Sequence, residues 1–253
     1  MTMPYRLPAG DDHHVGTFVK TTSAQVVEIL GGAGLDFAVL DAEHAPFDRA
    51  ALDAAMIAGR ATGLPLFVRV LERSAAGLLS VLDMGAAGVL VPHVDTEQDA
   101  REVVAHCRYV GGDRGYSSSP RAAGYGALGM RAAIAQGDRN VVVCQIESVE
   151  AVRNAAAIAA VPGVDALFIG RADLALSMGL QNAQDPAVIE ATLAVVRQTL
   201  AAGKAVGMFV GSTAERDKYR ALGVGWFVQG SDQAMLGQAA QAIARARPAP
   251  AGG

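Results

Sequence analysis

The sequence is poor in cysteine and in clustered positive charge. Cys107 and Cys144 are the only cysteines among its 253 residues, so neither a disulfide scaffold nor a cysteine-based metal site is expected. The formal net charge is −4, and no run of Lys and Arg is interleaved with aromatic residues. A nucleic-acid surface or an anionic-membrane surface is therefore not expected. The expected partner is a small molecule or another protein.

Long apolar runs are also missing. A helix that crosses a bilayer needs about 20 apolar residues, and no uncharged stretch of the chain reaches that length. Residues 1–15 carry Pro, Gly, Asp and His where a secretory signal would have a basic patch and an apolar block. We expect a cytoplasmic protein in which residues 1–15 are a polar extension and residues 247–253 a flexible tail. The adjacent His13 and His14 are expected to be solvated rather than to bind a metal.

Apolar residues are abundant and are arranged in short runs. They make up 51% of the chain, and eight apolar runs alternate with patterns typical of helices. The predicted strands cover residues 16–20, 37–40, 66–70, 88–91, 141–146, 166–169, 205–210 and 225–229. Parallel strands this apolar need cover on both faces, so we predict a single-domain α/β fold, a closed (β/α)8 TIM barrel over residues 1–253.

An open doubly wound sheet is the alternative fold. It would usually carry a Gly-rich turn after its first strand, whereas the glycines of residues 31–34 follow a predicted helix. Residues 110–130 are rich in Gly and Ser and break the alternation of strands and helices. We expect them to form a long irregular loop, which in a compact domain is usually functional or mobile.

Polar side chains follow the predicted strands. The run Phe37–Leu40 leads straight into Asp41, Glu43 and His44 before Pro46. A strand end with a helix cap would explain this stretch taken alone. The pattern recurs, however, and in a barrel the carboxyl ends of all strands open on the face where active sites are built. The other residues at these ends are Arg69, Glu72, His93, Asp95, Gln145, Glu147, Arg171, Asp173, Gln229, Ser231 and Asp232.

Two of these carboxylates suggest a metal site. Gln145 and Glu147 are two residues apart on one strand and so face the same way. Asp173 falls in the first turn of a short helix after Gly170, where free backbone amides could hold a carboxylate or phosphate. Oxygen ligands without cysteine suit Mg²⁺ or Mn²⁺ that keeps water and substrate as further ligands. Plain ion pairs of Glu147 with arginine are the alternative.

The order of several motifs resembles a known family. They are Asp-Ala-Glu-His-Ala-Pro at 41–46, Val-Arg-Val at 68–70, Leu-Asp-Met-Gly-Ala at 82–86, Val-Pro-His-Val-Asp-Thr at 91–96, Arg-Gly at 114–115, Gln-Ile-Glu-Ser at 145–148 and Phe-Ile-Gly-Arg-Ala-Asp-Leu at 168–174. Together they resemble the HpcH/HpaI family of class II pyruvate aldolases, over residues 16–244. The resemblance implies cleavage or formation of 4-hydroxy-2-oxo acids, giving pyruvate or a close 2-oxo acid and an aldehyde.

The resemblance also implies residue roles. A divalent ion, Mg²⁺, Mn²⁺ or Co²⁺, would be held by Glu147 and Asp173. His44 would be the base, Arg69 would stabilise the transition state, and Asp83 would raise the basicity of His44. Substrate contacts would fall on Gln145, on the backbone at Ala172 and on Asp173. Members of the family tend to form hexamers that exchange the last helix, which here would be residues 235–244.

The chain departs from the family near the substrate pockets. Arg171 replaces a common proline, Ala175 replaces a serine, and a Gly-Gly pair precedes Arg114 where the family has prolines. These changes put the substrate preference in question more than the chemistry.

Other functions remain open on the sequence alone. Lys20, the one lysine at a predicted strand's carboxyl end, could form a Schiff base. An acyl-CoA lyase of the citrate-lyase type would want a basic cluster for the nucleotide, and the sequence has none. A metal-independent barrel for phosphosugars could use the Gly-Ser pairs at 211–212 and 230–231. A non-catalytic binding role is the least favoured, because the charged residues are predicted to converge on one rim.

Overall fold

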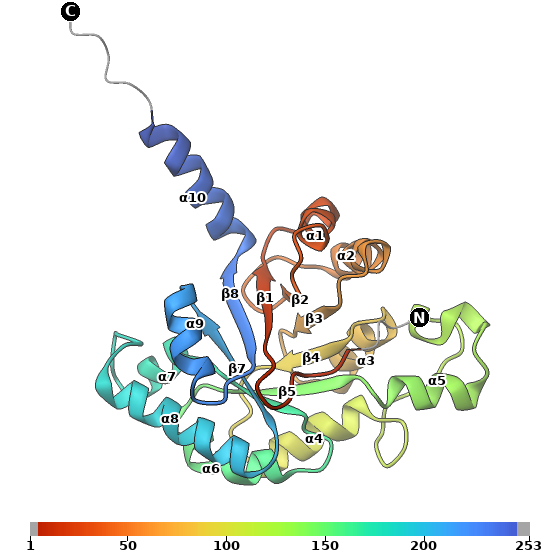
Figure 1. Cartoon of the computed structure of the whole chain (residues 1–253). Helices are drawn as coiled ribbons and strands as arrows, with labels where there is room; N and C mark the ends of the chain where they lie inside the picture. Colours follow the sequence, from red (N-terminus) through yellow and green to blue (C-terminus); the bar gives the residue numbers. More distant parts are fainter. Residues whose placement is uncertain (1–4, 247–253) are drawn as a thin grey trace, which may run out of the picture.

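The fold is a closed barrel of eight parallel strands in chain order, which confirms the predicted (β/α)8 architecture. Figure 1 shows the computed structural model, which describes residues 5–246. The predicted tail at 247–253 lies outside the described residues. The strands are β1 (His14–Val19), β2 (Phe37–Asp41), β3 (Leu66–Arg69), β4 (Gly88–Val91), β5 (Val141–Ile146), β6 (Ala166–Ile169), β7 (Ala205–Val210) and β8 (Trp226–Ser231).

Helices follow the strands and pack outside the barrel. Side-chain caps mark many of their starts; at Thr96 and Asp99 a capping box satisfies two backbone N–H groups reciprocally. The helices are α1 (Ala24–Gly31), α2 (Arg49–Thr62), α3 (Ala75–Asp83), α4 (Glu97–Cys107), η1 (Arg121–Gly126), α5 (Met130–Gly137), α6 (Val149–Ala160), α7 (Arg171–Ser177), α8 (Pro186–Ala201), α9 (Thr213–Arg220) and α10 (Asp232–Arg245).

The interior of the barrel is filled by aromatic side chains. The Phe37 ring stacks on the Trp226 ring with centroids 4.5 Å apart, and Phe67 and Phe168 meet Trp226 edge to face. Room for the indole comes from Gly207, where a Cβ would lie 2.7 Å from the Trp226 ring. A second, larger apolar core lies between the strands and the helices. The barrel is therefore a packed support for its rim, not an open channel.

The N-terminal segment closes the amino end of the barrel. The Tyr5 ring packs edge-on against Phe37 and Phe67, and its hydroxyl accepts a hydrogen bond of 2.9 Å from Trp226 Nε1. The first strand begins at His14, two residues before the predicted start, because the His14 N–H is already paired with the carbonyl of Gly225. Part of the segment predicted as a polar extension thus belongs to the barrel and its core.

The loop predicted at 110–130 is partly helical. Residues 121–126 form the 3-10 helix η1, which kinks at Gly124 and Tyr125, and α5 follows. Local propensity gives little sign of either helix, since both are short and glycine-bounded. Tertiary contacts hold them: Gln136 Nε2 donates to the Ala122 carbonyl at 3.1 Å.

The last helix stands apart from the others. Figure 1 shows α10 (blue) extending away from the barrel beyond the end of β8. Leu236 and Ile243 on this helix have exposed fractions of 73% and 75%. Within residues 5–246, no helix combines the length and apolar character needed to cross a membrane.

Candidate active site

A buried carboxylate organises the rim where β1, β2 and β3 end. Asp41 is fully buried, and the strand register places it beside Arg69. Arg69 Nε and Nη2 donate to the two Asp41 oxygens at 2.9 and 2.7 Å, and Lys20 Nζ lies 3.2 Å from Oδ2. Burial alone would raise the pKa of Asp41, but the hydrogen bonds and charge of Arg69, with help from the His44 N–H and Lys20, hold it below its usual range. Asp41 is therefore ionised, and its carboxylate holds Arg69 in place at the rim.

A second group of contacts leads from Arg69 across the rim to β5. Arg69 Nη1 lies 3.2 Å from Glu43 Oε2. The His93 ring stands between two carboxylates, with Nε2 3.4 Å from Glu43 Oε1 and Nδ1 3.1 Å from Glu147 Oε1. The His93 N–H also donates to Glu147 Oε1 at 2.8 Å from a backbone with φ of 55°, a conformation uncommon outside glycine. These contacts bring residues 43, 69, 93 and 147 together.

Glu147 is the most deeply placed acid of this group. Burial raises its pKa, and the nearby charge of Glu43 adds to the shift against hydrogen bonds from Gln145 and the His93 N–H. The Gln145 amide nitrogen donates to Glu147 Oε2, while Gln145 Oε1 is buried without a hydrogen-bond donor among the described residues. Such an acceptor is costly unless a ligand or water pairs with it.

The turn that carries Asp173 begins beside this carboxylate. A Cβ on Gly170 would be 3.0 Å from Glu147 Oε2, and Asp173 follows Gly170 by three residues in the first turn of α7. Within the described part of the chain, the Asp173 side chain makes no hydrogen bond or ion pair. Ala172 is exposed in the same turn. An unpaired carboxylate therefore follows, by three residues, a glycine that lies against the buried Glu147.

Residues 5–246 contain no cluster of three or more His, Cys, Asp or Glu arranged to hold a metal. An ion shared by Glu147 and Asp173 would thus have two protein carboxylates and would take its other ligands from water or substrate, as Mg²⁺ commonly does.

His44 lies at the outer edge of the same rim. Its N–H donates to Asp41 Oδ1 at 3.1 Å, and its ring nitrogen Nε2 is 3.6 Å from Glu43 Oε2. The side chain is 55% exposed, so it can reach a molecule bound in the mouth. Of the predicted site residues, the structure joins His44, Arg69, Gln145 and Glu147 in one connected group, and the helix that carries Asp173 begins at Gly170 beside Glu147.

Asp83 does not join this group within the chain. It ends α3, and because the helices run antiparallel to the strands, its last turn lies at the amino end of the barrel. There its Oδ1 accepts a hydrogen bond of 2.9 Å from Arg114 Nη2. Among the described residues, no hydrogen bond or ion pair joins Asp83 to His44. The carboxylate that does lie beside the imidazole is Glu43.

The ion pairs of Glu147 with Arg69 or Arg171, which were the alternative to a metal site, are not formed within residues 5–246. Arg69 is engaged by Asp41 and Glu43. Arg171 points away from the rim group: its Nη2 donates to Glu215 Oε1 at 2.7 Å and to the Phe209 carbonyl at 3.1 Å. Glu147 consequently has no guanidinium partner in the described structure, which favours a cationic ligand over an internal ion pair.

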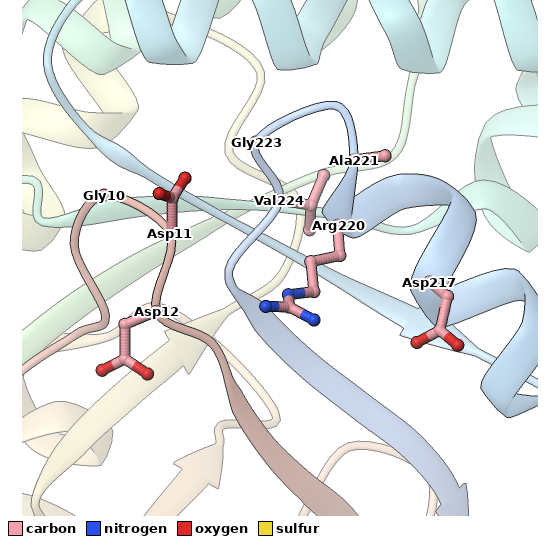
Figure 2. A pocket seen from close by; sticks show the side chains of 8 residues that line it. All are labelled: Gly10, Asp11, Asp12, Asp217, Arg220, Ala221, Gly223 and Val224. Atoms are coloured by element: carbon pink, nitrogen blue, oxygen red, sulfur yellow. The ribbon is translucent and has the colours of Figure 1, made fainter.

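A separate cavity lies at the opposite end of the barrel. It has a volume of about 490 Å³ and is lined by the N-terminal segment and the turn before β8. Figure 2 shows Asp11 and Asp12 on one side and Asp217 and Arg220, from α9, on the other. Because sites of this fold are built on the carboxyl ends of the strands, we do not assign the chemistry to this cavity.

Comparison with known proteins identifies relatives over most of the chain. The family model described as HpcH/HpaI aldolase/citrate lyase matches residues 14–241. A 5-keto-4-deoxy-D-glucarate aldolase of Shigella dysenteriae is 35% identical over 233 residues, which cover 91% of this chain and 90% of the relative.

Two solved structures share the fold over most of their length. An HpcH/HpaI-type aldolase/citrate lyase family protein from Burkholderia cenocepacia has 34% identity and a TM-score of 0.88, covering 94% of this chain and 96% of the other. An HpcH/HpaI aldolase from Desulfitobacterium hafniense has 26% identity and a TM-score of 0.89, covering 95% of each. The chain therefore belongs to the HpcH/HpaI aldolase/citrate lyase family and is an aldolase of class II, a carbon–carbon lyase.

Proposed function

We propose that this aldolase cleaves 4-hydroxy-2-oxo acids to pyruvate, or a close 2-oxo acid, and an aldehyde, and that it uses a divalent metal ion held by Glu147 and Asp173. The observation that carries the proposal is that both carboxylates follow the neighbouring strands β5 and β6 and that, in the described structure, neither is paired with a lysine or arginine. One is buried with a raised pKa, and the other has no partner in the described structure. The name of the relative from Shigella supports a keto-acid substrate.

The charges at the rim fit a divalent cation. Four carboxylates, those of Asp41, Glu43, Glu147 and Asp173, stand against the two fixed cations Arg69 and Lys20. With the histidines neutral, the formal charge is −2, which one divalent ion would offset. The unpaired Gln145 Oε1 adds an acceptor that a bound water could satisfy. A divalent ion bound here would supply Lewis-acid stabilisation of the oxygen that gains charge when the carbon–carbon bond breaks.

The roles of the side chains follow from their positions. Arg69, held rigidly by Asp41, directs a fixed positive charge towards the 2-oxo oxygen of the substrate. His44 moves the proton of the 4-hydroxyl group, with Glu43 placed to hold its imidazole. Gln145 and the backbone amides of the first turn of α7, near Ala172, orient the substrate carboxylate. Since Asp83 lies at the other end of the barrel, we assign it no role in proton transfer within one chain.

The active form is an oligomer, a hexamer on the family pattern, in which α10 packs on a neighbouring copy. The projecting helix with its exposed Leu236 and Ile243 supports this assignment. Light scattering of the purified protein should report a mass several times that of the chain, and Leu236→Asp should lower it. A monomeric wild-type protein would contradict the assignment.

The metal is tested by removing it. Treatment with EDTA should abolish pyruvate release from a panel of 4-hydroxy-2-oxo acids, and Mg²⁺, Mn²⁺ or Co²⁺ should each be tried for recovery. Pyruvate release that EDTA leaves untouched would refute the metal-dependent mechanism.

A matched pair of variants locates the ion. Glu147→Gln removes the buried carboxylate, while Glu150→Gln makes the same change on the exposed first turn of α6. We expect the first variant to lose Mn²⁺ binding, measured by calorimetry on the metal-free protein, and the second to retain it. Equal affinities in both variants would remove Glu147 from the metal site.

A further inference from the structure

Lys20 is a cation at the rim to which the aldolase chemistry gives no role. It directly follows β1, and its place is fixed because its N–H and that of Thr21 each donate at 2.9 Å to one oxygen of Asp232. Alternation along the strand puts Gly16, Phe18 and Lys20 on one side. Gly16 faces into the barrel, since a Cβ there would lie 2.6 Å from the Phe37 ring. The Lys20 side chain therefore points into the mouth of the barrel.

The Lys20 ammonium is less fully engaged than its neighbour Arg69. Arg69 gives three of its nitrogens to carboxylates and is almost buried. Lys20 has one carboxylate within ion-pair distance in the described structure, Asp41 at 3.2 Å, and its side chain is 30% exposed. An ammonium has three N–H donors, so donors remain for a molecule that enters the mouth.

An aromatic pair lies beside this ammonium, and its outer ring, Phe209, is exposed while Phe18 is buried. The rings of Phe18 and Phe209 are stacked with centroids 6.2 Å apart, and Phe209 is 41% exposed although it belongs to a barrel strand. The Phe18 ring lies between the two cations, 4.6 Å from the Arg69 guanidinium carbon and 5.9 Å from Lys20 Nζ. The rim thus offers an exposed aromatic ring, Phe209, that packs on Phe18 beside two neighbouring cations, Arg69 and Lys20.

We propose that Lys20 is a specificity-determining residue that binds a carboxylate on the aldehyde half of the substrate. The carbon chain of that half packs on the exposed ring of Phe209, and its carboxylate binds the ammonium. This inference rests on the proposed function, because it assigns the part of the substrate that the metal and Arg69 do not bind. It differs from the Schiff-base role considered for Lys20, since the residue acts through its charge and forms no covalent bond.

A carboxylate suits this place better than a phosphate. Asp41 is ionised within 3.2 Å of the ammonium, and Glu43 lies on the far side of Arg69. A phosphate dianion would feel roughly twice the repulsion from these acids that a carboxylate feels, while a single ammonium is its one counter-charge. A carboxylate carries one negative charge, which the Lys20 ammonium can balance because Asp41 does not fully neutralise it.

The test compares aldehydes that differ only in charge. Pyruvate is added to 4-oxobutanoate and, separately, to its methyl ester, and kcat/KM for the aldehyde is measured with the metal-loaded enzyme. We expect the wild type to favour the anion, and Lys20→Met to lower the ratio of the two values about 10- to 100-fold, the loss of one charge-assisted hydrogen bond. Lys20→Arg, which keeps the charge, should restore most of the ratio.

Two controls distinguish a local effect of Lys20 from a general loss of positive charge and from damage to the metal site. Arg216→Met removes a cation from the outer side of the barrel, where Arg216 Nη1 faces Gln229, and should leave the ratio unchanged. Mn²⁺ and oxalate, an analogue of the pyruvate enolate, should bind to Lys20→Met as they bind to the wild type in calorimetry. This second control shows that the donor half of the site is intact.

The outcomes are distinct. If Lys20→Met lowers kcat/KM equally for the acid and its ester, or if the wild type prefers the ester, the role of Lys20 is refuted while the aldolase function stands. Absence of any condensation with either aldehyde in the metal-loaded wild type refutes the proposed function, and the role of Lys20 falls with it. Borohydride trapping of pyruvate on Lys20 would replace the electrostatic role by a covalent one.

Discussion

Arg69 has a structural role and a proposed catalytic role, and two substitutions can separate them. Arg69→Met keeps most of the side-chain volume but removes the charge from beside Asp41, which is fully buried. Breaking one partner of a buried ion pair costs about 3–5 kcal/mol, because the other charge is left uncompensated. Lys20 and the His44 N–H still contact Asp41, so we expect a loss of unfolding free energy near 3 kcal/mol, the lower end of that range.

The double variant Asp41→Asn/Arg69→Met removes both charges. Replacing a complete buried pair by neutral groups is often nearly neutral, so the double variant should recover most of the lost stability. Activity should not recover, because removing a fixed charge that stabilises a developing oxyanion costs about 10²–10³ in kcat.

The assays are urea unfolding of the metal-free proteins and pyruvate release by the metal-loaded ones. Metal-free protein is used for unfolding because a bound ion would add its own stabilisation. If Arg69→Met has the same free energy of unfolding as the wild type, Arg69 does not compensate the buried charge of Asp41. Near-normal pyruvate release by the folded double variant would show that Arg69 serves only to hold the rim together.

Three further substitutions test the packing and charge of the fold. Arg69 keeps the pKa of Asp41 below its ordinary value of 3.8, so the carboxylate stabilises the fold above that pH and this stabilisation is lost as the pH falls towards the folded pKa. Asp41→Asn should therefore reduce the fall in unfolding free energy at acid pH, measured by urea unfolding. An unchanged pH dependence would contradict the assigned role of Arg69. Tyr5→Phe leaves the buried Trp226 N–H without its acceptor and should cost about 1–3 kcal/mol in urea unfolding with kcat unchanged. Gly207→Ala puts a methyl group 2.7 Å from the Trp226 ring and should lower stability by about 1–3 kcal/mol; a melting temperature equal to that of the wild type would show that the ring can yield.

The architecture was readable because it depends on repeated, redundant signals. Each buried strand is a short run such as Phe37–Leu40, and a boundary wrong by one or two residues does not alter the order of elements. The helices η1 and α5 were missed for the opposite reason. They have no long apolar stripe, and they exist because Arg121 and Gln136 bond to main-chain carbonyls elsewhere in the fold. Contacts of this kind cannot be read from local pattern.

The sequence predicts which side chains lie on the rim, and those residue roles stay a prediction, but it does not predict how the side chains pair. The position of Glu147 and Asp173 after adjacent strands follows from the barrel topology. The carboxylate that lies beside His44 cannot be predicted in the same way. The choice between Glu43 and Asp83 depends on the end of the barrel at which α3 ends. That end follows from the antiparallel course of the helix, a step that motif order alone does not include. The sequence predicted His93 on the rim. It did not predict the position of His93 between two acids, because that position depends on the unusual backbone conformation of this residue.

The carboxylates of the rim affect both the stability of the fold and its affinity for a cation. Burial and the charge of Glu43 make the ionised form of Glu147 unfavourable, which raises its pKa. A cation at the same place reverses both effects, since it replaces lost hydration and opposes the repulsion between the acids. The strain at His93 and the unpaired Gln145 oxygen belong to the same small region. The interactions that make the ionised form of Glu147 unfavourable are thus the ones that favour a bound ion. Arg69 and Lys20 limit the net negative charge of the rim to what a single divalent ion can offset.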